Sequence, residues 1–117
     1  MPLVVGLSFI AAGLILLLVG KLANDGRLKR NQLAGIRTRG TTESNETWLA
    51  AHQAAWPSLF WAGVASVVVG LSLAVFEPSD GDSFALMGIG VVSMIALVVS
   101  ATKKATRAAA KVAPGDA

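Results

Sequence analysis

Three long apolar runs, separated by one polar segment and one short connection, set the pattern of this chain. Residues 2–20, 57–76 and 83–101 contain no Asp, Glu, Lys or Arg. A helix of about 19 residues is about 28 Å long, close to the roughly 30 Å of a bilayer's hydrocarbon core. The pattern therefore predicts an all-α integral membrane protein with three transmembrane helices.

The first apolar run could instead be a cleaved signal peptide. No basic region precedes it, and Lys21 follows where a small-residue cleavage site would stand. The run is also longer than the roughly 7–15 apolar residues of a signal peptide. We therefore expect residues 2–20 to remain as a membrane span.

The polar loop 21–55 is expected to begin without helix and to end in one. Its first part contains Gly26, Gly35 and Gly40. Glycine weakens a helix interior by roughly 1 kcal/mol relative to alanine. A helix should restart near Thr41 or Thr42, because a hydroxyl can cap free N–H groups there and Glu43 and Glu46 suit the positive end of the helix dipole.

Three aromatic side chains follow at helical spacing. Trp48, His52 and Trp56 stand at i, i+4 and i+8 and so share one helix face. Tryptophan prefers the lipid headgroup region, so this face predicts a short interfacial helix in the loop. Pro57 lies at the mouth of the second span, where it either starts the helix or kinks it.

Small residues recur along the first two spans. The second span carries Ala62, Ser66 and Gly70, and the first carries Gly6, Gly13 and Gly20. Small residues at such spacing let helix backbones approach closely in lipid. We expect them to pack the spans of one chain together, with an oligomer interface as the alternative. Turn residues in the connection 77–82 predict that spans two and three are antiparallel neighbours.

The basic residues are unevenly placed around the predicted spans. The central loop holds six Lys and Arg and the tail 102–117 holds four, whereas the connection after span two has only acidic charges. The positive-inside rule then predicts a multi-pass protein of the bacterial plasma membrane, with its N-terminus outside and its C-terminus cytoplasmic. The basic side chains of the tail should face anionic lipid rather than nucleic acid; they are Lys103, Lys104, Arg107 and Lys111.

Few groups are available for catalysis or metal binding. The chain has no cysteine, and His52 is its one histidine. A hydrolase needs a nucleophile and an orienting carboxylate around its histidine, and a zinc site needs about three protein ligands. We therefore expect no enzyme activity, no metal and no cofactor. His52 is expected to hydrogen-bond within the loop or at the headgroup boundary, or to contact a partner.

Transport is also disfavoured. Ion and proton pathways usually need ionisable groups within the membrane, and the three apolar runs have none. An oligomeric pore stays open as an alternative.

Arg37 and Thr38 follow Gly35 in a predicted turn. A guanidinium forms paired hydrogen bonds with carboxylates and phosphates, so this turn could hold an anion or a helix end. A lipid phosphate, or a salt bridge to Glu43 or Glu46, are the alternatives.

The loop also carries a pattern of specific residues at compact spacing. It consists of Arg30-Asn31, Gly35-Ile36-Arg37-Thr38, Thr41, Ser44, Trp48 and Ala51-His52. This pattern resembles the signature loop of the SdpI family, small bacterial membrane proteins named for immunity to a secreted peptide toxin. Fuller members carry additional spans, whereas this chain has room for three.

The resemblance implies a non-enzymatic, immunity- or sensor-type protein that binds a membrane-active peptide or a cytoplasmic regulator through loop 30–52. The implied binding or structural residues are Asn31, Gly35, Arg37, Thr38, Trp48 and His52. Gly35 would set the turn, Arg37 and Thr38 would make polar contacts, and Trp48 and His52 would fix the helix at the membrane boundary. The alternative is an accessory subunit of a larger membrane complex, or a homo-oligomer, that docks through the small-residue stripes.

Overall fold

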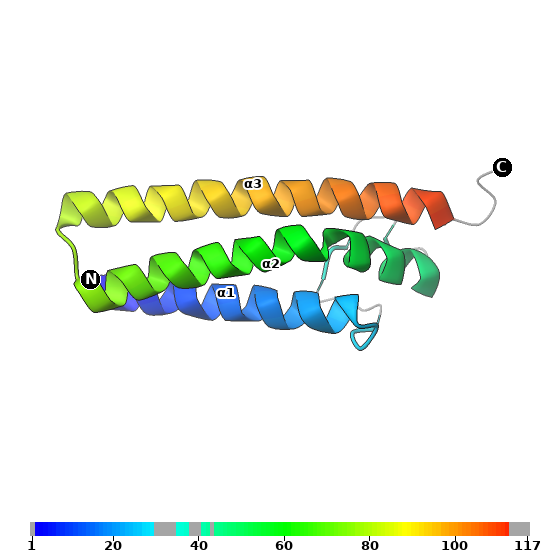
Figure 1. Cartoon of the computed structure of the whole chain (residues 1–117), viewed down its shortest axis with the longest axis horizontal. Helices are drawn as coiled ribbons and strands as arrows, with labels where there is room; N and C mark the ends of the chain where they lie inside the picture. The colour runs from blue at the N-terminus through cyan, green and yellow to red at the C-terminus, as the bar shows by residue number, and fades with distance from the viewer. Residues whose placement is uncertain (1, 30–34, 38–40, 43, 113–117) are drawn as a thin grey trace.

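The fold is a bundle of three long helices in which the second helix lies between the other two. The computed structural model describes residues 2–29, 35–37, 41–42 and 44–112. The helices are α1 (Pro2–Asn24), α2 (Asn45–Phe76) and α3 (Asp80–Val112). Both outer helices pack along α2 (Figure 1). Each helix is long and apolar enough to cross a membrane, which confirms the prediction of three spans.

The second helix begins earlier than the sequence pattern suggested. Residues 45–56 form the first turns of α2, so the described part of the chain contains no separate interfacial helix. Pro57 lies inside this helix. It has no N–H to donate to the carbonyl of Gln53, and proline at such a site kinks a helix. Figure 1 shows the matching change in direction along α2.

The second and third helices are much longer than a bilayer's apolar core. At about 1.5 Å per residue, α2 is about 48 Å long and α3 about 50 Å long, against a core of roughly 30 Å. Residues 102–112, expected as part of a basic tail, continue α3 as regular helix. The two helices therefore extend together beyond the apolar core by roughly 20 Å, at the end where the loop lies.

Alanine side chains join α2 and α3 in this extension. The contact buries Ala51, Ala55 and Leu59 of α2 and Ala101, Ala105 and Ala109 of α3. The three alanines of α3 are four residues apart, so they form one face that lets the helix axes come close. Lys103, Arg107 and Lys111 repeat at the same spacing on the exposed side. One helix segment thus has an alanine face towards α2 and a basic face outward.

Glycines join α1 to α2 at three levels. A methyl group on Gly13 would lie 2.6 Å from the carbonyl oxygen of Gly63, and one on Gly70 would lie 2.5 Å from that of Gly6. At the third level Gly20 faces the indole of Trp56. The small-residue stripes therefore do pack two spans of the same chain, as expected. An accessory subunit could not dock on these glycines without separating α1 from α2.

A glycine cap ends α1. Gly26 has a φ of +75°, and the N–H of Arg27 donates to the carbonyl of Leu22 over 2.8 Å, which is the Schellman pattern.

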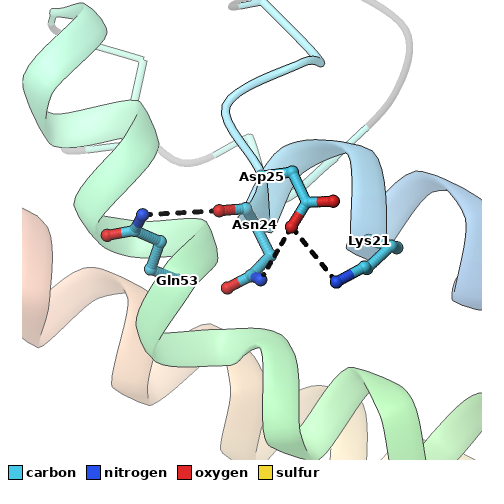
Figure 2. A network of polar contacts seen from close by, with 4 residues as sticks. All are labelled: Lys21, Asn24, Asp25 and Gln53. Carbon is cyan, nitrogen blue, oxygen red and sulfur yellow. Dashed lines mark hydrogen bonds and ion pairs between the residues drawn. The ribbon is translucent and has the colours of Figure 1, made fainter.

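Figure 2 shows the polar contacts that hold the C-terminal end of α1. Lys21 pairs with Asp25 at 3.2 Å, and the side-chain amide of Gln53 donates to the carbonyl of Asn24 over 3.3 Å. The loop therefore leaves α1 from a fixed point beside the first turns of α2.

Candidate functional site

A capping box starts α2. Ser44 has extended backbone angles, and its hydroxyl accepts the N–H of Thr47 over 3.1 Å. In return, the hydroxyl of Thr47 accepts the N–H of Ser44 over 2.9 Å. Two free N–H groups at the helix start are thereby satisfied. The expected start near Thr41 or Thr42 is wrong, because Ser44, not either threonine, is the cap.

Thr41 instead links the preceding loop to the cap of α2 by hydrogen bonds. It is fully buried, and its hydroxyl donates to the carbonyl of Ile36 over 2.8 Å. The carbonyl of Thr41 lies 3.2 Å from the hydroxyl of Thr47. The cap of α2 and the turn around Ile36 are therefore one hydrogen-bonded unit.

Thr47→Val should destabilise this unit by about 1–3 kcal/mol, because valine keeps the shape but leaves buried polar groups without partners. Thr47→Ser keeps the hydroxyl and should lose less than half as much. Equilibrium unfolding of the purified variants in detergent measures both values. If valine and serine proved equally stable, the hydroxyl bonds would contribute nothing to stability.

Trp48 and His52 face the loop rather than the lipid. The Trp48 side chain is 3% exposed, and its indole N–H donates to the carbonyl of Leu28 over 2.9 Å. The rings of Trp48 and His52 lie 4.3 Å apart, centroid to centroid. The protein's own loop covers this face of α2, which the sequence had suggested would lie along the membrane surface.

Both ring nitrogens of His52 are hydrogen-bonded, one to the loop and one to its own helix α2. The backbone N–H of Ile36 can only donate, and it lies 2.8 Å from Nε2. Nε2 is therefore the unprotonated acceptor, and Nδ1 carries the hydrogen, which it donates to the carbonyl of Trp48 over 2.8 Å. Since the side chain is fully buried, a neutral imidazole of one defined tautomer joins the loop to α2. We call this contact the His52 latch.

Gly35 makes the latch possible. Its φ is +96°, a backbone conformation that favours glycine. A methyl group on its Cα would lie 2.8 Å from Nε2 of His52 and 2.9 Å from the ring of Trp48. The absence of a side chain therefore lets the loop backbone reach the histidine. The chain bends at Gly35, and the close approach to His52 is a second reason for glycine there.

An apolar groove begins next to the latch. It has a volume of about 320 Å³ and is partly open to the outside. Its walls come from all three helices and the loop; they are Ile15, Leu16, Val19, Gly20, Gly35, Ile36, His52, Leu59 and Val98. The signature loop thus closes one end of a groove that otherwise runs between membrane-spanning segments.

The structure brings together only some of the residues singled out in the sequence. Gly35, Trp48 and His52 meet in the latch, whereas Arg37 is exposed beside it. Asn31 and Thr38 lie outside the described residues.

The four basic residues of α3 are all exposed, and Lys104 also donates to the hydroxyl of Ser58 over 3.0 Å. These residues lie on the part of α3 that continues past the apolar run, outside the alanine contact with α2.

Some contacts of the site could not be predicted from the sequence. Leu28 and Ile36 take part through backbone groups, which have no signature in a sequence. Thr47 could have been found, since a hydroxyl residue three positions after Ser44 fits a capping box. Among the described residues, no group of three His, Cys, Asp or Glu side chains could hold a metal ion. The contacts that the structure shows at this site are hydrogen bonds and apolar packing.

Comparison with known proteins identifies a family for this chain. The model of the SdpI/YfhL protein family matches residues 27–101, which is more than half of the chain and includes the latch, α2 and the apolar part of α3. Searches of curated proteins and of solved structures found no match. The family match includes residues 30–52, which carry the residue pattern described above. This three-helix membrane protein therefore belongs to the SdpI/YfhL protein family.

Proposed function

We propose that this protein is a non-catalytic, immunity- or sensor-type membrane protein, and that loop 30–52 binds a membrane-active peptide or a cytoplasmic regulator. The observation that carries the proposal is the His52 latch. Helix–helix connections in bundles usually have about 2–8 residues, and longer ones that are held in place usually have a function. The connection 25–44 is longer, and buried side chains of α2 bind its backbone at Leu28 and Ile36.

Arg37 is the residue best placed to meet such a partner. It follows Ile36, whose N–H and carbonyl are both held, so the backbone that carries Arg37 is positioned while its side chain is exposed. A guanidinium suits a carboxylate, such as a peptide C-terminus or an acidic side chain. This combination of a fixed backbone and an exposed cation supports a binding role.

The charges of the described residues support a cytoplasmic location for the loop. Basic side chains gather at the end of the bundle that holds the loop and the end of α3, whereas Glu77, Asp80 and Asp82 lie at the opposite end. By the positive-inside rule the loop end is cytoplasmic and the N-terminus is outside, in the bacterial plasma membrane.

Arg37→Ala should abolish protection against the cognate peptide without lowering the amount of protein in the membrane. The test compares growth of a deletion strain, complemented with wild type or variant, against a panel of membrane-active peptides. Arg107→Ala is the matched control, since it removes an exposed guanidinium from α3 and should keep full protection. Equal loss of protection with both variants would mean that overall charge, not the loop, matters.

The competing function is that of an accessory subunit of a larger complex. The surface expected to bind the other subunits, however, is already buried between α1 and α2. The glycines proposed to form it face one another between α1 and α2. Purification in mild detergent separates the two functions. Stoichiometric co-purification with other membrane subunits, together with no peptide sensitivity of the deletion strain, would reject the immunity or sensor proposal.

A further inference from the structure

The contact between His52 and the loop requires a neutral imidazole. Nε2 accepts the N–H of Ile36 over 2.8 Å, and the hydrogen on Nδ1 is donated to the carbonyl of Trp48 over 2.8 Å. A protonated imidazole carries a hydrogen on both nitrogens and can only donate. Protonation of Nε2 would therefore set two N–H groups against each other, and the His52 latch could not stay closed.

The packing around the imidazole holds it in this position. The side chain is fully buried, and its ring centroid lies 4.3 Å from that of Trp48. A methyl group on Gly35 would lie 2.8 Å from Nε2, so the loop backbone lies close against this edge of the ring. Among the described residues, the N–H of Ile36 is the one hydrogen-bond partner of Nε2. A hydrogen placed on Nε2 would find no acceptor among them while the loop is closed.

The surrounding charges also disfavour a protonated ring in the closed latch. The charged side chains of the flanking segments are exposed, whereas His52 is buried; they are Lys21 of α1, Asp25, Lys29 and Arg37 of the connection, Glu46 of α2 and Lys104 of α3. Most of them are cations, and Asp25 already pairs with Lys21. Within the described ranges, no carboxylate forms an ion pair with His52. A buried charge without a partner is costly, so the ring gains a proton far more readily once the loop has opened.

We propose that His52 is a pH-dependent switch for the loop: the neutral ring holds the loop closed, and a proton taken up at Nε2 releases the Ile36 N–H and opens the loop. A histidine in water titrates near pH 6.5. Since the closed latch binds no proton at Nε2 and the open one does, acid favours the open form. The ratio of open to closed should rise about tenfold for each pH unit below about 6.5 and stay constant well above it.

The switch would also act on Arg37. The Ile36 N–H and carbonyl hold the backbone that carries this exposed side chain, so opening the latch frees it to move. A partner bound through Arg37 would then bind less tightly in acid. This consequence rests on the proposed function, whereas the switch concerns the loop alone and is measured without any partner.

Hydrogen exchange of the full chain in lipid nanodiscs, followed by NMR, tests the switch. The measured quantity is the protection factor of the Ile36 amide, which is its intrinsic exchange rate divided by its observed rate. From about pH 7.5 to about pH 5.5 this factor should fall roughly tenfold in the wild type, because one of the two pH units lies below 6.5. The Gly90 amide, in the middle of α3, is the internal control and should keep its protection factor.

His52→Gln is the matched variant. The glutamine side chain can accept the Ile36 N–H but does not titrate, so its protection factor should be the same at both pH values. The proposal is overturned if the wild-type factor at Ile36 does not change with pH, or if the factor at Gly90 falls equally, which would mean general unfolding in acid. It is also overturned if His52→Gln loses as much protection as the wild type, because another group would then be titrating. Should His52→Gln leave Ile36 unprotected at both pH values, the comparison of Ile36 with Gly90 in the wild type decides alone.

Discussion

Gly13→Ala is expected to lower the free energy of unfolding by about 3 kcal/mol, because overpacking of a tight contact costs about 1–3 kcal/mol or more. The added methyl group would lie 2.6 Å from the carbonyl oxygen of Gly63 and 3.0 Å from the backbone N of Val67. These are backbone atoms, so no side chain can rotate away to make room. The helices α1 and α2 would have to move apart along their whole contact, which also loses the fits at Gly6 and Gly20.

Gly88→Ala is the matched control for this prediction. Gly88 is also a glycine inside a membrane-spanning helix, but a methyl group there would meet nothing within 4 Å. Alanine should therefore leave stability unchanged or raise it by up to about 1 kcal/mol through its better helix propensity. Equilibrium unfolding in detergent, followed by circular dichroism, gives both values. If the two variants were equally stable, the glycine contact between α1 and α2 would not hold the bundle.

His52→Ala is expected to open the loop, with a local cost of about 2–4 kcal/mol. The substitution removes the acceptor of the Ile36 N–H, the ring contact with Trp48 and a fully buried side chain. Loss of buried volume and an unsatisfied N–H group both contribute. Hydrogen exchange at the Ile36 amide should therefore accelerate roughly 30- to 700-fold, since about 1.4 kcal/mol corresponds to a factor of ten.

His52→Gln separates the hydrogen bond from the packing. The carbonyl oxygen of the glutamine side chain can accept the Ile36 N–H in place of Nε2, so exchange at this amide should be slower than in His52→Ala. Amides in the middle of α3, such as that of Gly90, should exchange at the wild-type rate in both variants. A wild-type exchange rate at Ile36 in His52→Ala would show that the latch does not hold the loop.

The sequence was sufficient to predict the three spans. A charge-free run of this length is rarely stable outside a membrane. The three runs could therefore be predicted to span a membrane without any knowledge of their contacts. The intervals of seven between Gly6, Gly13 and Gly20 also indicated a packing face, and the structure identifies its partner as Gly63 and Gly70 of α2. The charge-free runs and the glycine intervals are strong signals, because each depends on a property that many residues repeat.

The ends of the helices and the latch were harder to predict. Pro57 suggested a boundary, yet α2 runs through it, because packing on α1 and α3 holds the turns on both sides. The latch depends on Nε2 of His52 meeting a backbone N–H sixteen residues earlier, and no residue type at Ile36 announces that contact. The sequence placed Gly35 and His52 in one loop but could not show that one touches the other.

The unequal lengths of the two connections set an order of assembly. Only residues 77–79 join α2 to α3, whereas residues 25–44 join α1 to α2. The entropy cost of closing a loop rises with its length, so the hairpin of α2 and α3 closes more readily than the contact of α1 with α2. During synthesis α1 is made before α2, so its glycines cannot meet Gly63 and Gly70 until α2 follows. The helix α1 thus gains its packing partner only once α2 is in place.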